Sequence, residues 1–387
     1  MRASLEPPKR AEAVYGWGAG LRYVFPRWML VTLLAGLLGT LGLRLHPAVG
    51  GGVATHCLDA WPWFSMWTRW DAGWYVNIAT NGYSYRPGAQ SAVAYFPLYP
   101  LLIRAGTSLG GNPFAWGIAV TWLCGLSAAT CLLAWAKERS GLETARRALW
   151  VFLTWPYAFI LFGAVYSDAL FVALSLGSFL ALERRRVWTA TALGALAMAC
   201  RVVGLAVALG LFVREMELRR AEGKPLSIRD AIPLLSGLGL AAYQSFLGYR
   251  FGDALAFLHA QTGWQQAPGF RTWLKLSYFK SFSQPVMAGW LSLHAALGIL
   301  LLVLAVRGRR QLGWGYTTYV VCVLAIPLAG TKDFMSMGRY AIAAFPSFLL
   351  LEVGLQRHPK LRTAWRVVST GLLIFATRQF AVGRYVA

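Results

Sequence analysis

The sequence predicts an all-helical polytopic membrane protein. Of its 387 residues, 57% are hydrophobic and 14% aromatic, and the mean hydropathy is +0.50. Only 13% are charged, about half the share found in a soluble domain. This composition excludes an ordinary soluble enzyme, a disordered chain and a disulfide scaffold. The five Cys are an odd number, and four of them lie in apolar runs, so no disulfide framework is expected.

Apolar runs near the ~20 residues needed for a membrane span define a bundle of about 11 transmembrane helices, within a range of 10 to 13. The short neighbours 187–200 and 203–216 are expected to be tilted or partly unwound. The stretch 94–110 contains Pro97, Pro100 and Arg104, and we interpret it as a re-entrant or interfacial segment. The expected spans are 29–46, 113–136, 148–165, 167–183, 187–200, 203–216, 231–249, 285–306, 312–330, 339–355 and 366–383.

The net charge of +22 would indicate a nucleic-acid partner in a soluble protein. Here, with the N-terminus inside, 24 of the 37 Lys and Arg fall in the inside loops, as the positive-inside rule expects. We therefore interpret the charge as a topology signal, and no nucleic acid is expected as a partner. The outer side then carries only five carboxylates, which are those of Asp59, Asp71, Asp168, Asp253 and Asp333.

Two large outer loops, 47–112 and 250–284, contrast with short basic inner loops. This contrast favours a functional site on the outer face. A polar segment at 217–230 is typical of a cytoplasmic linker. It divides the expected chain into an N-terminal catalytic membrane module, 1–216, and a C-terminal membrane module, 231–387.

The motif WTRWDAGWYVNIATNGY, residues 67–83, places Asp71 among aromatic side chains beside the membrane. An ionisable group there is costly unless it is paired, which indicates function. The alternative is an interfacial helix with a Trp67, Trp70, Trp74 stripe, in which Arg69 and Asp71 face water.

Two further ionisable residues interrupt apolar runs. Asp168 opens a span, where it could orient a sugar hydroxyl or, with Ser167, merely cap the helix. Arg201 lies between two short apolar segments and needs an anionic partner, either an acidic side chain or a ligand phosphate.

The remaining candidates come from outer segments of the C-terminal half. TKDFMSMGRY, residues 331–340, could hold a lipid phosphate or serve only to anchor the interface. Residues 257–266 could bind sugar or pack their own loop. No zinc-type spacing and no convincing metal-ligand set occurs, so no metal ligand is assigned, dependence on a divalent metal stays open, and no cofactor is expected. The candidates from these two segments are Gln261, Trp264, Lys332, Ser336, Arg339 and Tyr340.

Three blocks of the chain resemble one known family. They are similar to blocks of the PIG-V type mannosyltransferases and their bacterial relatives, and they read RWDAGWYVNIATNGY with AYFPLYPLL, then VYSDALFVALSLGSFLALERRRVWTATALGALAMACRVVGL, and finally SMGRYAIAAFP. That family belongs to the GT-C superfamily of membrane glycosyltransferases. The chain departs from the family at Asp168, Cys200 and Val202, where Glu, Thr and Pro are more usual.

The resemblance implies a GT-C-like bundle in the inner membrane of a bacterium, with its site facing outward. It also implies a polyprenyl-phosphate donor of a sugar, mannose by the family name, a lipid-linked or glycan acceptor, and an acidic base at the position of Asp71. We expect an inverting transfer in which Arg201, Arg339 and Lys332 stabilise the leaving phosphate. The side chains expected to contact substrate in the N-terminal half are Arg69, Trp70, Trp74, Asn77, Tyr83, Phe96, Tyr166 and Asp168.

Two other functions remain open at this point. Intramembrane charges also mark transporters, so a flippase of a lipid-linked sugar is the main alternative. Transporters often show paired internal repeats with broken helices, whereas the sequence offers one such break, near Arg201. A non-catalytic assembly subunit would need neither Asp71 nor a basic outer pocket.

Overall fold

The computed structural model describes residues 17–46 and 61–386, which form helices and connecting loops and no strand. The predicted outer carboxylate Asp59 lies outside this range. The α-helices are α1 (Trp17–Leu45), α2 (Pro62–Ser65), α3 (Ala72–Asn81), α4 (Leu98–Thr107), α5 (Pro113–Ser140), α6 (Leu142–Leu153), α7 (Asp168–Glu183), α8 (Val187–Cys200), α9 (Leu205–Ala221), α10 (Leu238–Phe251), α11 (Ala256–His259), α12 (Phe270–Trp273), α13 (Leu276–Lys280), α14 (Pro285–Arg307), α15 (Arg309–Leu312), α16 (Trp314–Gly330), α17 (Met337–Tyr340), α18 (Phe345–Gln356) and α19 (Pro359–Ala381). The 3₁₀ turns are η1 (Ala92–Ala94), η2 (Ala158–Leu161), η3 (Val202–Gly204), η4 (Ile228–Gly237), η5 (Ala260–Trp264), η6 (Ser281–Ser283) and η7 (Ala341–Ala343).

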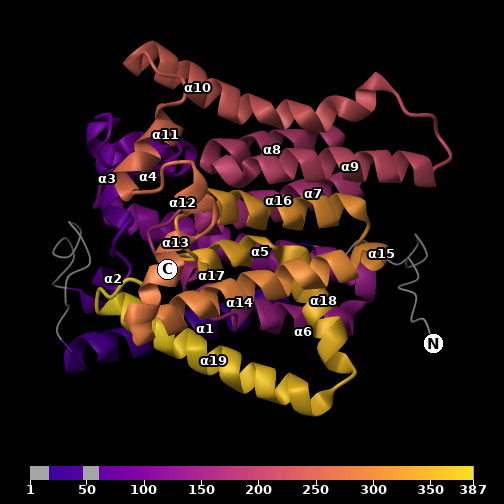
Figure 1. Ribbon diagram of the computed structural model, residues 1–387. Coiled ribbons are helices and arrows are strands. Elements are labelled where there is room, and N and C mark those ends of the chain that lie inside the picture. The colour runs from indigo at the N-terminus through magenta and orange to yellow at the C-terminus, as the bar shows by residue number, and fades with distance from the viewer. Residues whose placement is uncertain (1–16, 47–60, 387) are drawn as a thin grey trace.

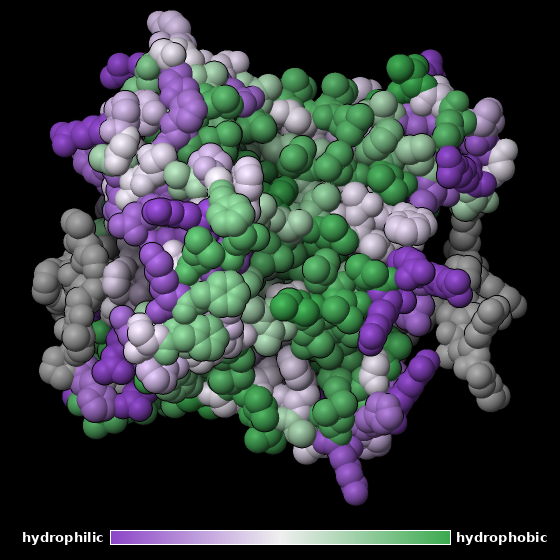
Figure 2. All heavy atoms as spheres, in the orientation of Figure 1, coloured by the Kyte–Doolittle hydropathy of each residue, from purple (hydrophilic) through white to green (hydrophobic). Residues whose placement is uncertain are grey.

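The long helices run side by side along the bundle (Figure 1). Figure 2 shows a broad hydrophobic band across the middle of this face, with hydrophilic residues gathered at both ends. Within the described residues, four helices are long and apolar enough to cross a membrane: Trp17–Leu45, Pro113–Ser140, Ile228–Phe251 and Pro285–Arg307. The predicted class, a polytopic helical membrane protein, is confirmed.

The number of spans is not settled by these four helices. A fifth span would arise if the pair Met337–Ala343 and Phe345–Gln356, bent by 89°, counts as one. Each of the eleven predicted segments overlaps a helix, but several helices are short, so the count of eleven stays a prediction.

Two predicted spans are not single helices. The segment 339–355 runs from α17 through η7 into α18 across the 89° bend. The segment 148–165 is not one helix, because α6 ends at Leu153 and a 3₁₀ turn and a loop follow. Trp155 precedes Pro156, and the proline ring disfavours helical geometry in the residue before it. Residues 162–167, which follow this 3₁₀ turn, form a loop that leads directly into α7.

The ambiguous segment 94–110 forms η1 and the ten-residue helix α4. At 1.5 Å per residue α4 is about 15 Å long, half the thickness of a bilayer core. It is too short to cross, as predicted. The break expected between 187–200 and 203–216 is also present, because Arg201 adopts an extended conformation (φ −158°, ψ 146°) between α8 and η3.

The two ends of the bundle collect different loops (Figure 1). Helices α3, α4, α11, α12, α13 and α17 gather at one end, whereas α15 and the connection after α9 lie at the other. The segments predicted to be outer and inner therefore separate as the charge pattern requires, and we refer to the two ends as outer and inner. The predicted linker 217–230 covers the end of α9 and the start of η4. Because α16 packs along α9 in one shared core, the division into two modules stays a prediction.

Candidate active site

Asp71 is held at the outer end by an unusual turn. Trp70 before it has φ 55°, in the left-handed region that aromatic residues rarely adopt. Helix α3 starts at the next residue, and the Asp71 side chain makes no capping bond to it. The carboxylate is therefore free to point away from α3, and its side chain is 21% exposed.

Arg339 approaches Asp71 from the far end of the sequence. It lies in α17, which also begins after a residue in the left-handed region, Ser336 (φ 66°). The buried Arg339 Nη1 donates to Asp71 Oδ2 at 3.1 Å and lies 3.7 Å from Asp168 Oδ2. One guanidinium thus bridges two carboxylates. Backbone strain of this kind concentrates at functional sites.

Asp168 and Arg201 complete the arrangement. Asp168 is the first residue of α7 and is buried, and its Oδ1 accepts a hydrogen bond from Arg201 Nη1. Arg201 sits in the break before η3, where it can reach across. We name Asp71, Asp168, Arg201 and Arg339 the outer cluster. Two acids and two arginines alternate in it, so its formal charge is balanced.

The structure answers two questions that the sequence left open: the partner of Arg201 and the role of Ser167. Arg201 is paired with a side chain, Asp168, which leaves phosphate binding there a prediction. The capping interpretation of Ser167 is wrong, because its side chain makes no capping bond to α7. Ser167 Oγ lies instead 2.7 Å from the hydroxyl of Tyr75.

Tyr95 is the nearest neutral partner of Asp71. Its hydroxyl donates to Asp71 Oδ1 at 3.2 Å. Burial, with the nearby Asp71 charge, raises the pKa of Tyr95 well above its ordinary value, so the hydroxyl keeps its proton. On the other side, Asp71 N donates to the hydroxyl of Tyr166 at 3.4 Å, and the Tyr166 ring lies 4.8 Å from Arg339 Cζ.

Aromatic rings surround the outer cluster. Trp74 stacks on Tyr95 with ring centroids 5.6 Å apart, and Trp264 packs edge-on against Trp74 at 5.9 Å. Trp70 packs edge-on against Tyr385 at 5.0 Å. These rings come from both predicted outer loops and from the C-terminus. Flat apolar faces beside charged groups suit a sugar ring, which is apolar on its faces and polar at its edge.

The backbone that presents Arg339 is clamped on both sides at Gly338. Trp155 Nε1 donates to Gly338 O at 3.1 Å, and Gly338 N donates to His294 Nδ1 at 3.3 Å. His294 Nε2 lies 2.5 Å from the hydroxyl of Tyr157. All three side chains are fully buried. This support fixes the position of the guanidinium.

Most of the sequence candidates lie in or against the outer cluster. Ser336 Oγ is 3.1 Å from the hydroxyl of Tyr385, and Tyr340 accepts a bond from Arg339 at 3.3 Å. The candidates that the structure brings together are Trp70, Asp71, Trp74, Tyr166, Asp168, Arg201, Trp264, Ser336, Arg339 and Tyr340.

Other candidates have different neighbours. Asn77 is exposed and bonds Asn81, Gln261 bonds the carbonyl of Phe257, and Lys332 bonds Gln265. The roles of Asn77, Gln261 and Lys332 toward substrate therefore remain predictions.

Arg69, Tyr83 and Phe96 also lie away from the outer cluster. Arg69 is buried and donates to the carbonyl of Ala381 at 3.0 Å, so the interfacial-helix alternative, with Arg69 in water, is wrong. Phe96 packs in a separate apolar core, and Tyr83 donates to the carbonyl of Tyr95.

Two residues of the site, Tyr95 and Tyr385, were not predicted from the sequence. Tyr95 stands in the AYFPLYPLL block, one position before the chosen Phe96, so a signal for it existed. Tyr385 lies near the C-terminus in a segment without any motif, and no signal pointed to it.

The described residues contain no group of three His, Cys, Asp or Glu close enough to hold a metal ion. Within the outer cluster, both carboxylates already have arginine partners. The carboxylates of the outer cluster are therefore engaged by the protein's own cations.

Residues 59–218 match the model of the family described as Mannosyltransferase (PIG-V), which confirms the resemblance in the part of the chain that carries Asp71, Asp168 and Arg201. No curated protein matches the sequence.

Two solved structures are similar. The first is ArnT from Cupriavidus metallidurans bound to undecaprenyl phosphate, with TM-score 0.51, 15% identity, 94% of this chain covered and 64% of that one. The second is the apo oligosaccharyltransferase from Archaeoglobus fulgidus, with TM-score 0.45, 12% identity, 93% of this chain covered and 56% of that one. The chain thus spans less than two thirds of either structure. The similarity to ArnT supports the GT-C-like fold.

Proposed function

We propose that the protein is an inverting membrane glycosyltransferase. It moves a sugar, mannose by the family name, from a polyprenyl-phosphate donor to a hydroxyl of a lipid-linked or glycan acceptor at the outer face of the plasma membrane. The observation that carries this proposal is the bridge that Arg339 makes between Asp71 and Asp168 inside a ring of aromatic side chains. The family match and the undecaprenyl phosphate in the ArnT structure support it.

Asp71 is the general base of the proposed reaction. Arg339 Nη1 donates to one oxygen of the carboxylate and the hydroxyl of Tyr95 donates to the other, so the carboxylate is held in one orientation. An acceptor hydroxyl that reaches Asp71 gives up its proton as its oxygen attacks the anomeric carbon. General-base assistance of this kind contributes about 10²- to 10⁴-fold in rate.

The leaving group is the lipid phosphate. As the bond between the anomeric carbon and the phosphate oxygen breaks, the electron pair stays on that oxygen. Arg201 and Arg339 stabilise the growing charge by charge-assisted hydrogen bonds that are already oriented. A phosphate leaves without the strong acid assistance that an alcohol needs, so one carboxylate base suffices. The products are the glycoside, the lipid phosphate and a protonated Asp71, which loses its proton to water.

The test is Asp71→Asn in purified protein supplied with polyprenyl-phosphate mannose and a lipid acceptor. We expect a loss of transfer of about 10²- to 10⁴-fold, with the unfolding temperature and donor binding close to those of the wild type. Asp333→Asn is the matched control: it removes the same charge from a neighbouring loop without touching the outer cluster. Transfer by Asp71→Asn at the wild-type rate would falsify the assignment of the base.

The flippase alternative makes a different prediction. A flippase moves its lipid between two leaflets and needs a membrane with two sides. Transfer of radiolabelled sugar by the protein in detergent micelles, which have no second side, therefore separates the two functions. Micelles in which no glycoside forms, together with vesicles in which the lipid crosses, would favour the flippase.

A further inference from the structure

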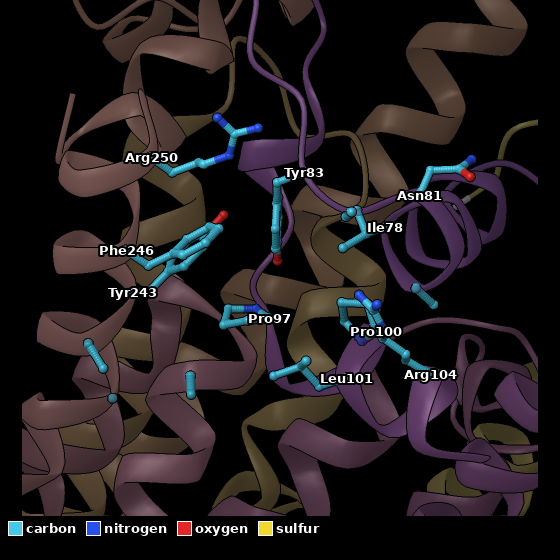
Figure 3. A pocket seen from close by; sticks show the side chains of 15 residues that line it. Ile78, Asn81, Tyr83, Pro97, Pro100, Leu101, Arg104, Tyr243, Phe246 and Arg250 are labelled. Carbon is cyan, nitrogen blue, oxygen red and sulfur yellow. The ribbon is translucent and has the colours of Figure 1, made fainter. Parts of the chain in front are cut away.

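A pocket lies at the outer end of the bundle, apart from the outer cluster. It has a volume of about 650 Å³ and is bounded by α3, α4, α8 and α10. Figure 3 shows side chains from these helices facing one another across the space. Its lining is mainly apolar and includes Ile78, Pro97, Leu101, Tyr243 and Phe246. We refer to it as the lateral pocket.

Two arginines line the lateral pocket on opposite sides of Tyr83, Arg104 from α4 and Arg250 from α10 (Figure 3). Each lies in the last turn of its helix, where the helix dipole stabilises a positive charge. Both are exposed, and neither forms an ion pair with a carboxylate within 17–46 and 61–386. The pocket therefore carries two positive charges that its own walls leave unneutralised.

The lateral pocket borders the surface that lipid covers. Its wall from α10 belongs to Ile228–Phe251, a helix apolar and long enough to cross the membrane. Phe246, which lines the pocket, is 40% exposed, and the neighbouring Tyr249 is 93% exposed. In the membrane such side chains contact acyl chains. A ligand can thus enter sideways from the bilayer.

The wall of the lateral pocket is connected to the outer cluster. Tyr83, which lines it, donates to the carbonyl of Tyr95 at 2.8 Å, and the hydroxyl of Tyr95 bonds Asp71. Tyr243 donates to the carbonyls of Val93 and Tyr95, at 2.8 and 3.3 Å. Two residues therefore separate the pocket from the proposed base, so this is a site distinct from the phosphate position at Arg201 and Arg339.

We propose that the lateral pocket binds an anionic phospholipid of the bilayer. Arg104 and Arg250 hold the phosphate, since guanidinium groups donate paired hydrogen bonds to phosphate oxygens. The acyl chain lies against Phe246 and the apolar face of α10, where it gains the free energy of burial. A lipid bound there contacts the segment that supports Asp71.

Photolabelling tests the proposal directly. The purified protein is incubated with phosphatidylglycerol that carries a photoreactive acyl chain, and with diacylglycerol that carries the same chain and no phosphate. We expect phosphatidylglycerol to label residues of α4 and α10 about tenfold more than diacylglycerol does. Arg104→Gln with Arg250→Gln should lower its labelling to the diacylglycerol level.

Two controls make the result specific. Arg86→Gln with Arg271→Gln removes the same charge from two exposed positions of the outer loops and should leave the labelling unchanged. Ala242→Phe, which fills the pocket while both arginines remain, should block labelling by both lipids.

Three results would overturn the proposal: equal labelling by the two lipids, labelling that survives the loss of both arginines, or full competition by inorganic phosphate, which would indicate a site for a small anion. Labelling needs no sugar transfer, so a negative labelling result would not contradict the proposed glycosyltransferase. Likewise, a failure of the transfer assay would not contradict lipid binding in the lateral pocket.

Discussion

Helix α7 carries a buried charge cluster at each of its ends, and the two clusters are built differently. Asp168, its first residue, belongs to the outer cluster, and Glu183, its last, belongs to an inner cluster with Arg139, Arg214 and Tyr316. In the inner cluster both oxygens of the carboxylate are occupied. Oε1 accepts from Arg139, from Arg214 at 2.7 Å and from Tyr316 at 2.8 Å, and Oε2 accepts from Arg214 at 3.2 Å.

The outer cluster leaves acceptor capacity unused. Asp168 Oδ2 is buried and has no hydrogen-bond partner, with Arg339 Nη1 near it at 3.7 Å. Asp71 is partly open and stands among Trp70, Trp74 and Tyr95. Buried polar atoms are nearly always bonded, and Asp168 Oδ2 is free to accept a hydrogen bond from a ligand hydroxyl. The two clusters are therefore alike in the pairing of their charges, and they differ in the unoccupied carboxylate oxygen of the outer one.

The largest expected effect comes from the inner cluster. Glu183→Gln leaves the largely buried Arg139 without its counter-charge and leaves Arg214 with Glu217 alone, which should lower the free energy of unfolding by about 3–5 kcal/mol. Thermal or denaturant unfolding in detergent measures it. The control is Glu143→Gln, which breaks the exposed pair with Arg147 and should cost under about 0.5 kcal/mol.

The same variant also tests whether the inner cluster takes part in the reaction. The transfer activity of folded Glu183→Gln, per molecule, should match the wild type, whereas Asp71→Asn should lose activity and keep stability. A specific loss of turnover in the folded inner-cluster variant would mean that both clusters take part in the reaction.

A smaller effect is expected from the clamp that holds Arg339. A Cβ on Gly338 would lie 2.2 Å from the buried Tyr157 ring, so Gly338→Ala must displace the ring or α17. Overpacking of this kind costs about 1–3 kcal/mol. Because the displaced segment carries Arg339, we expect kcat to fall about tenfold or more, with KM for the acceptor nearly unchanged.

Gly354→Ala, in the adjoining helix α18, has nothing within 4 Å of the added methyl and is the matched control. Loss of stability in Gly338→Ala with kcat preserved would show that the clamp serves the fold only. It would then have no part in positioning the guanidinium.

The sequence could identify the members of the outer cluster but not their pairing. Asp71, Asp168, Arg201 and Arg339 stand out because charges are rare in apolar or outer segments, where they are costly. That Arg339 bridges Asp71 and Asp168 depends on contacts between residues far apart in the chain, up to 268 positions. No local pattern records such a contact. The same limit explains Tyr385, which reaches the site only because α19 returns the chain to the outer end.

Side-chain direction outside regular helices was equally beyond the sequence. Helical spacing assigned Trp67, Trp70 and Trp74 to one face, yet α3 begins only at Ala72 and Trp70 is in a left-handed turn. That turn buries Arg69 against the carbonyl of Ala381 and turns Asp71 toward Arg339. In the same way, Tyr95 rather than Phe96 faces Asp71 in an extended segment, where neighbouring side chains point in opposite directions.

The smallest expected effect comes from an exposed ion pair that belongs to neither cluster. In the second outer loop, Asp253 Oδ2 bonds His259 Nδ1 at 2.7 Å and accepts from the hydroxyl of Tyr85 at 3.1 Å. The hydrogen bond from His259 holds the pKa of Asp253 below its ordinary value of 3.8. A lowered carboxyl pKa means that the stabilisation is present above about pH 4 and is lost as the pH falls through the folded-state pKa.

Asp253→Asn should therefore increase hydrogen exchange in residues 253–264 at neutral pH by at most about fivefold, since exposed pairs contribute under about 1 kcal/mol. After correction for the intrinsic exchange rate, wild type and variant should converge only below the lowered folded-state pKa, where the carboxyl is protonated in both the folded and the unfolded chain. A difference that persists in acid would mean that Asp253 acts through its neutral hydrogen bonds. An effect on stability as large as that of Glu183→Gln would mean that exposed and buried ion pairs contribute equally in this protein.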